Sequence, residues 1–134
     1  MKILLVDDDP GTLNALRIGL LSHGFHVLTA GSGGGAMEII RESAARNDPV
    51  RLLISDFRMP RMDGLQLIRE AKAVLPELST VLITGYGSEG LREEAERAGV
   101  SDYLEKPFTP DVLVRVIDGF AKARSSAAGN AASL

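Results

Sequence analysis

Carboxylate side chains follow two short apolar runs of the sequence, one near the amino terminus and one near the middle. The acids that follow these runs are Asp7, Asp8, Asp9 and Asp56. Carboxylates packed together repel one another, and burial makes the ionisation of each more costly. A hard cation with oxygen ligands relieves both penalties, and six-coordinate Mg²⁺ held by one or two carboxylates and several waters fits best. The pattern therefore predicts a Mg²⁺ site.

The three consecutive aspartates are not equivalent in this interpretation. Asp9 precedes Pro10, and an aspartate before a proline is typical of a helix N-cap, so a capping role is favoured over a metal role. Asp7 and Asp8 are also compatible with solvated charges at the end of a strand. Asp56 at the end of a second strand favours a binding site for these two acids.

Asp56 occupies the position of a nucleophile, because it follows a fully apolar run. Carboxylates are recognised covalent catalysts, although a turn-initiating aspartate is the structural alternative. Phosphoryl transfer needs mostly positioning and charge neutralisation. Thr84 and Lys106 follow later apolar runs and would contact the oxygens of a phosphoryl group on Asp56.

Short apolar runs alternate with helical patterns along the chain, which predicts the elements that position these side chains. The expected strands are residues 3–6, 25–28, 52–54, 80–83 and 100–104. Continuous apolar strands between helices indicate a parallel sheet that is covered on both faces. We therefore expect an open, doubly wound α/β domain with five strands, with its binding crevice beyond the carboxyl ends of the strands.

Signals for the ends of elements agree with this organisation. Thr109 and Pro110 predict the start of the last helix, and Gly24 and Gly99 stand where earlier helices should stop. The domain is expected to span residues 1–124. Residues 125–134 are small, uncharged and without periodicity, which predicts a disordered tail or a linker.

Composition excludes several classes of function. The chain has 134 residues, with 15 basic and 18 acidic side chains and a net charge of −3. This balance argues against direct binding of nucleic acid. The absence of cysteine excludes disulfides and thiolate metal sites. No apolar run reaches the length of a membrane span, so we expect a soluble, cytoplasmic domain that does not bind membranes.

Four motifs in order give the chain its resemblance to a known family. They are ILLVDDD, SDFRMPRMDG, VLITG and DYLEKPF. The sequence resembles the receiver domain of a two-component response regulator from residue 2 to about residue 123. The resemblance implies a flavodoxin-like (βα)5 fold, in keeping with the doubly wound sheet expected above.

The resemblance also implies roles for the acids. Asp56 would accept a phosphoryl group from a sensor histidine kinase or a histidine phosphotransfer protein. Asp8 and Asp56 would bind Mg²⁺ directly, Asp7 largely through water, and the backbone carbonyl of Arg58 would be a further ligand. Apart from self-phosphorylation and self-dephosphorylation, no enzymatic activity is implied.

The remaining roles implied by the family concern switching. Thr84 would be the switch hydroxyl, Tyr103 the aromatic that follows it, and Lys106 the cation that pairs with the phosphoryl group, next to a commonly cis bond to Pro107. Arg58 and Tyr86 occupy positions that tune phosphoryl lifetime. The fourth helix, fifth strand and fifth helix would contact a downstream protein or effector domain, with a phosphorylation-linked dimer as a further form. The three glycines of residues 85–90 predict a mobile segment.

Three other functions compete with this interpretation. Residues 31–36 fit the pattern G-x-G-x-x-A of dinucleotide-binding proteins, but they follow the second expected strand instead of the first. A small Mg²⁺-dependent phosphatase with an aspartyl nucleophile would need a second acid two residues after Asp56, where Arg58 stands. A docking module that works without phosphorylation is disfavoured, since every site residue is present. A stand-alone protein and a piece of a longer regulator or hybrid kinase are equally compatible with the sequence.

Overall fold

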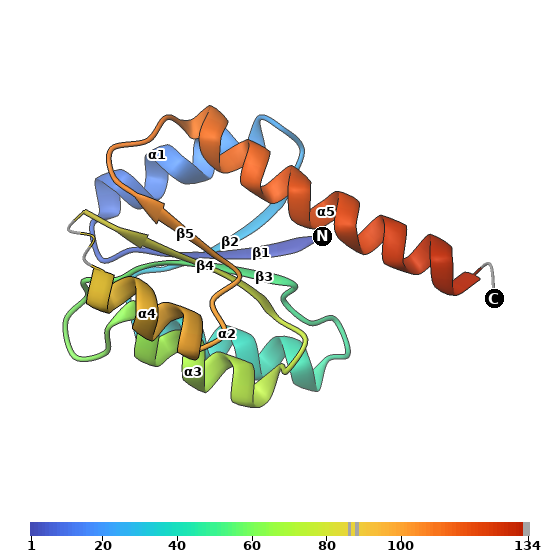
Figure 1. Ribbon diagram of the computed structural model, residues 1–134, viewed down its shortest axis with the longest axis horizontal. Coiled ribbons are helices and arrows are strands. Elements are labelled where there is room, and N and C mark those ends of the chain that lie inside the picture. Colours follow the sequence, from blue (N-terminus) through green and yellow to red (C-terminus); the bar gives the residue numbers. More distant parts are fainter. Residues whose placement is uncertain (86, 88, 133–134) are drawn as a thin grey trace.

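The sheet has five parallel strands in the order β2-β1-β3-β4-β5 (Figure 1). The computed structural model describes residues 1–85, 87 and 89–132, with side chains described as far as residue 123. The strands are β1 (Lys2–Val6), β2 (His26–Ala30), β3 (Leu52–Asp56), β4 (Ser79–Thr84) and β5 (Asp102–Glu105). Each strand except the last is followed by a helix that leads to the next strand, so the predicted doubly wound α/β fold is confirmed.

Five helices cover both faces of the sheet. They are α1 (Pro10–Leu21), α2 (Gly33–Ala45), α3 (Gly64–Val74), α4 (Glu89–Arg97) and α5 (Pro110–Ala132). Helices α1 and α5 lie on one face, and α2, α3 and α4 lie on the other (Figure 1). The described residues contain no helix that is both long enough and apolar enough to cross a bilayer.

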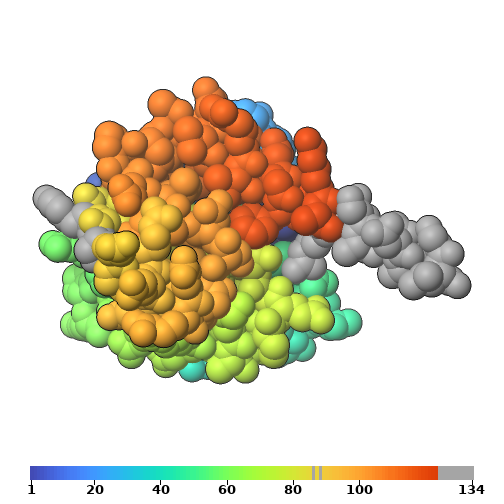
Figure 2. Space-filling view, viewed as in Figure 1, coloured from blue at the N-terminus to red at the C-terminus, as the bar shows by residue number. Residues whose placement is uncertain are grey.

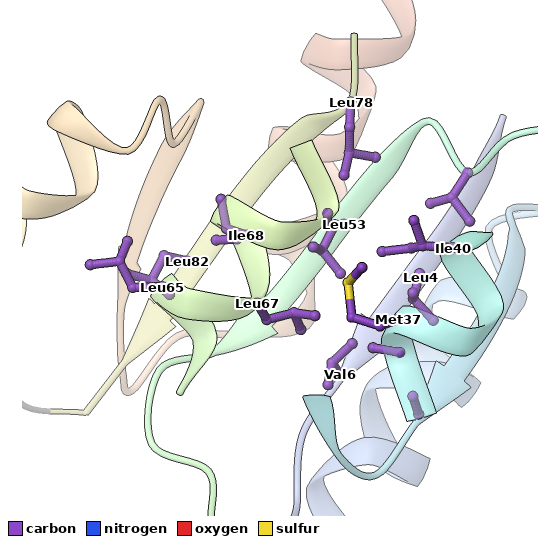
Figure 3. Close-up of a cluster of buried hydrophobic side chains, with 14 of the residues drawn as sticks. Leu4, Val6, Met37, Ile40, Leu53, Leu65, Leu67, Ile68, Leu78 and Leu82 are labelled. Atoms are coloured by element: carbon purple, nitrogen blue, oxygen red, sulfur yellow. The ribbon is translucent and has the colours of Figure 1, made fainter. Parts of the chain in front are cut away.

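The core consists of two layers, one on each face of the sheet. Successive side chains of β1 alternate between them, with Leu4 in the layer under α2 and α3 and Leu5 in the layer under α1 and α5. Figure 3 shows the first layer, in which Leu4, Leu53 and Met37 point toward one another from β1, β3 and α2. Because both faces are covered, the inner strands β1, β3 and β4 are almost fully buried, which explains their apolar runs.

The start of each of three helices is fixed by a short polar side chain. Asp9 accepts a hydrogen bond from the Thr12 backbone N–H, as the sequence predicted. Ser32 caps α2 and Asp63 caps α3 in the same way, and neither was predicted. Gly24 and Gly99 have φ angles of 83° and 79°, a left-handed conformation that favours glycine and ends a helix.

Several boundaries differ from the predicted ones. Strand β2 begins at His26, because the Phe25 backbone N–H still bonds to Leu20 at the end of α1. Strand β5 begins at Asp102, because the Val100 backbone N–H still bonds to Ala95 at the end of α4. Residue 88, where the fourth helix was expected to begin, lies outside the described residues.

Helix α5 continues to Ala132, past the boundary expected at residue 124. Its last turns extend beyond the sheet in Figure 1. The division of the chain into a domain at residues 1–124 and a disordered tail or linker at residues 125–134 stays a prediction.

Leu53→Ala should lower the free energy of unfolding by about 2–5 kcal/mol, because Leu53 is fully buried in the central strand and its loss leaves a cavity. Ile18→Ala is the control, since the Ile18 side chain is 55% exposed on α1 and should change stability by less than about 0.5 kcal/mol. Urea unfolding followed by circular dichroism measures both. Equal effects of the two variants would contradict the core described above.

Candidate functional site

Three carboxylates meet at the carboxyl ends of β1 and β3. Asp7 and Asp8 follow β1, Asp56 ends β3, and one carboxylate oxygen from each lies within 4.8 Å of the others. Strands β1 and β3 are neighbours in the sheet, although β2 separates them in the sequence. The strand order therefore changes direction between β1 and β3, which is where open α/β sheets bind their ligands.

The three acids differ in their exposure. Asp7 is 4% exposed and Asp56 is 8% exposed, whereas Asp8 lies on the surface. Burial raises the pKa of Asp7, and repulsion from Asp56 raises it further, although a hydrogen bond from the Asp9 backbone N–H opposes this rise. Burial and mutual repulsion thus disfavour the ionised form of these carboxylates, and a bound cation would compensate their negative charge.

Lys106 supplies one positive charge to this cluster. Its Nζ lies 3.0 Å from Asp56 Oδ1 and 3.9 Å from Asp7 Oδ2. Burial alone would lower the pKa of Lys106, but the hydrogen bond to Asp56 and the attraction of Asp56 and Asp7 outweigh burial and leave the pKa raised. One ammonium group lies beside three carboxylates, so an excess of negative charge remains for a further cation to balance.

The chain after β5 sets the position of this lysine. The backbone N–H of Lys106 donates to the carbonyl of Thr84 at 2.8 Å, and the peptide bond between Lys106 and Pro107 is cis, as the family resemblance implied. Thr84 itself ends β4 and is 1% exposed. The ends of β3, β4 and β5 therefore bring Asp56, Thr84 and Lys106 to one edge of the sheet.

Asp9 caps helix α1 and is not part of the acidic cluster. Its Oδ2 accepts hydrogen bonds from the backbone N–H of Thr12 at 3.2 Å and from the Thr12 hydroxyl at 2.5 Å. These bonds lower the pKa of Asp9. The prediction that Asp9 caps a helix is confirmed.

The loop of residues 57–63, which we call the acceptor loop, borders the acids. Together with Asp8 it surrounds an open hollow of about 440 Å³ whose lining includes Phe57, Arg58 and Met59. The Phe57 backbone N–H donates to Ile83, and the Gly64 backbone N–H donates to Phe57. A side chain at Gly64 would collide with the main-chain oxygen of Asp56, so this close turn requires glycine.

Tyr103 lies on β5, where it contacts α4. The guanidinium of Arg92 lies 4.8 Å from the centre of the Tyr103 ring and 3.8 Å from Glu105. Burial raises the pKa of Tyr103, with a smaller contribution from Glu105, and its hydroxyl has no hydrogen-bond partner among the described residues. Tyr86, the other aromatic implied by the resemblance, lies outside the described residues.

Sequence reasoning missed Asp63, Gly64 and the contact between Gly33 and Met62. Asp63 was recoverable, because a polar residue three positions before Gln66 matches the capping pattern. Gly64 and Gly33 depend on contacts between distant segments, which no local pattern reports. The glycine run of residues 31–36 follows β2 and opens α2, away from the β1 turn that a dinucleotide would need.

Comparison with known proteins supports the resemblance to receiver domains over most of the chain. Residues 3–118 match the family model of the response regulator receiver domain. The transcriptional regulatory protein GlrR of Escherichia coli (strain K12) is 40% identical over 116 residues, which cover 87% of this chain and 25% of GlrR. The uncharacterized 14.6 kDa protein in sodA1 3'region of Leptolyngbya boryana is 36% identical over 126 residues, which cover 92% of each chain.

Among solved structures, a response regulator receiver domain protein from Clostridium thermocellum has a TM-score of 0.82 and 28% identity, over 92% of this chain and 96% of its own. The chain thus spans about a quarter of GlrR but nearly all of this solved domain. The matched residues 3–118 include all four motifs, and the solved domain shares the fold. The chain belongs to the response regulator receiver domain family of two-component signalling.

Proposed function

We propose that this receiver domain accepts a phosphoryl group on the Asp56 carboxylate from a phosphohistidine of a sensor histidine kinase or a histidine phosphotransfer protein. The observation that carries the proposal is the position of Asp56, which is paired with Lys106 at 3.0 Å and grouped with Asp7 and Asp8 beside an open hollow. A carboxylate oxygen forms the new P–O bond, the P–N bond breaks, and its electron pair returns to the imidazole of the donor.

The acidic cluster fits a hard divalent cation, and we propose Mg²⁺. Three carboxylates against one lysine leave an excess of negative charge, and the exposure of Asp8 at the hollow allows water ligands to remain. Asp8 and Asp56 would bind the ion directly, Asp7 through water, and the backbone carbonyl of Arg58 would complete the protein ligands. When bound, the ion neutralises charge between the carboxylate and the incoming phosphoryl oxygens.

Lys106 and Thr84 would bind the phosphoryl group once it is attached to Asp56. Lys106 already hydrogen-bonds to Asp56, so its ammonium needs only a small shift to pair with phosphoryl oxygens on the same residue. Thr84 ends the neighbouring strand β4. Its hydroxyl would donate a hydrogen bond to the oxygens of the same phosphoryl group. Charge-assisted hydrogen bonds of this kind are about twice as strong as neutral ones, so phosphorylation favours the arrangement in which both residues contact the phosphoryl group.

The output surface consists of α4, β5 and α5, which face the viewer in Figures 1 and 2. Arg92 links α4 to β5 through Tyr103 and Glu105, and a hollow of about 560 Å³ lies where β5 leads into α5. We propose that this surface binds a downstream protein or effector domain, or a second copy in a phosphorylation-linked dimer, in the cytoplasm. GlrR is a transcriptional regulatory protein, whereas this acidic domain is not expected to contact nucleic acid directly.

Labelling with a small phosphoryl donor tests the proposal. Incubation with acetyl phosphate and Mg²⁺ should add one phosphoryl group per chain, detected by intact mass, and hydroxylamine should remove it, as it removes acyl phosphates. The second candidate, an aspartyl phosphatase, predicts instead many cycles of p-nitrophenyl phosphate hydrolysis. Arg58 stands where such an enzyme needs an acid, so a single turnover is expected. Absence of labelling would contradict the proposal.

Hydrogen exchange should detect the switch. Beryllofluoride stands in for the phosphoryl group, and it should change the protection of residues 84–104, because Thr84 and Lys106 are recruited at the two ends of this segment. Residues 40–45 serve as the internal control, because they lie at the end of α2, where Ser43 accepts a hydrogen bond from Val50 before β3, away from the site. Identical protection of residues 84–104 with and without beryllofluoride would count against a switch here and favour a passive relay.

A further inference from the structure

The glycine-rich segment at the start of α2 has no part in the function proposed above. Its four glycines are Gly31, Gly33, Gly34 and Gly35, with Ser32 between the first two. Ser32 caps α2 through the Gly35 backbone N–H at 3.1 Å. A cap needs one short polar residue, and glycine in the first turn weakens a helix, so capping does not explain the run.

One of these glycines lies in contact with the acceptor loop. A methyl group on Gly33 would lie 2.6 Å from Met62 Sδ and 2.9 Å from Met62 Cβ, which is closer than nonbonded carbon and sulfur atoms approach. Gly33 is buried. Gly31 and Gly34, by contrast, have nothing within 4 Å of such a methyl group. The Met62 side chain therefore rests directly on the backbone at the start of α2.

Met62 lies in the acceptor loop between two backbone hydrogen bonds that hold the start and the end of the loop. The start of the loop is held by the bond from Phe57 to Ile83, and its end by the bond from Gly64 to Phe57. Between these points Arg61 has a φ of 71°, and the Met62 N–H bonds back to Pro60 within the loop. The contact with Gly33 thus fixes the middle of the loop against α2.

We propose that Gly33 and Met62 are positioning residues for the phosphoacceptor site. Their contact, which we call the loop seat, sets the height of the acceptor loop above the sheet, and with it the place of the Arg58 carbonyl beside Asp8 and Asp56. The inference rests on the proposed function, because the site that the seat positions is the proposed metal and phosphoryl site. Residue 33 must be glycine because the Met62 side chain packs against its backbone. No bound nucleotide is needed to explain this glycine.

Gly33→Ala and Gly34→Ala form a matched pair that tests the loop seat. Both place alanine in the first turn of α2, so both gain the same intrinsic helix propensity. Only the methyl at residue 33 meets Met62. Gly33→Ala should weaken Mg²⁺ binding about tenfold, as the loss of an outer support does for other metal sites, while Gly34→Ala stays within about twofold of the wild type. A Mg²⁺ titration followed by amide NMR shifts gives these affinities in folded protein.

Spectra of the metal-free proteins separate positioning from lost stability. Gly33→Ala should shift the amide resonances of residues 57–63, whereas Gly34→Ala should leave them in place. Met62→Ala tests the seat from the other side and should also weaken Mg²⁺ binding, with the fold retained. In the Met62→Ala background, Gly33→Ala should weaken Mg²⁺ binding less than in the wild type, because Sδ and Cγ are gone and only Cβ, at 2.9 Å, still meets the added methyl group.

The outcomes distinguish a failure of the loop seat from a failure of the proposed function. If the wild type binds Mg²⁺ and Gly33→Ala binds it as well as Gly34→Ala does, the loop seat is overturned and the proposed function stands. Additive effects of Gly33→Ala and Met62→Ala would also overturn the seat. If the wild type binds no Mg²⁺ and accepts no phosphoryl group, the proposed function fails, and the seat has no site to position.

Discussion

Asp56→Asn should abolish phosphoryl labelling by acetyl phosphate, with a fall in rate of more than about 10⁴-fold, as expected when a covalent nucleophile is removed. The substitution replaces a charged oxygen by an amide nitrogen with nearly the same shape. Asp56 is buried beside Lys106, so an isosteric amide should fit the same space and keep the fold. What is lost is the negative charge and the lone pair that attack phosphorus.

Asp63→Asn is the matched control for this variant. Asp63 follows Asp56 on the acceptor loop, and its carboxylate is engaged with the Gln66 backbone N–H at 2.8 Å. Asparagine caps helices as well as aspartate does, so this variant should keep both the fold and the labelling. Intact mass and peptide mapping after hydroxylamine treatment measure the two variants side by side. Labelling that persists in Asp56→Asn would place the acceptor elsewhere.

The order of the elements was predictable from the sequence because burial on both faces of the sheet leaves a local signature. Strands such as β3, Leu52–Asp56, consist almost entirely of buried residues, and such runs stand out against the amphipathic helices. Boundaries were less predictable. Phe25 has the residue type of a strand and packs against the core, but its backbone N–H bonds to Leu20 at the end of α1. A local pattern cannot tell a core residue in a strand from one before it.

The grouping of three acids at one edge of the sheet was predictable from the sequence, but not which of them would be buried. Parallel strands all end at one edge, so Asp7, Asp8 and Asp56 had to lie near one another once the fold was known. The different burial of Asp7 and Asp8 comes from the packing around them. The loop seat of Gly33 and Met62 joins residues that are far apart in the sequence, and a glycine run by itself suggested a different ligand.

The exposure of Asp8 and the capping bonds of Asp9 separate two neighbouring acids by function. Asp8 borders the open hollow beside the acceptor loop, and its carboxylate belongs to the acidic cluster. The Asp9 carboxylate instead accepts hydrogen bonds from the backbone N–H and the hydroxyl of Thr12. An ion held by the cluster therefore depends on the charge of Asp8, whereas the start of α1 depends on Asp9.

Asp8→Asn should accordingly abolish Mg²⁺-dependent labelling of Asp56, since it removes a charged ligand from the proposed metal site. Asp9→Asn should keep both labelling and stability, because asparagine still caps α1. Asp9→Ala should keep the labelling but lower the urea midpoint of unfolding, because the Thr12 backbone N–H loses its partner. Labelling rates over a Mg²⁺ titration, with urea unfolding of each variant, measure these effects. If Asp9→Ala abolished labelling while Asp8→Asn retained it, the two acids would have exchanged roles, and the metal site would lie at the start of α1.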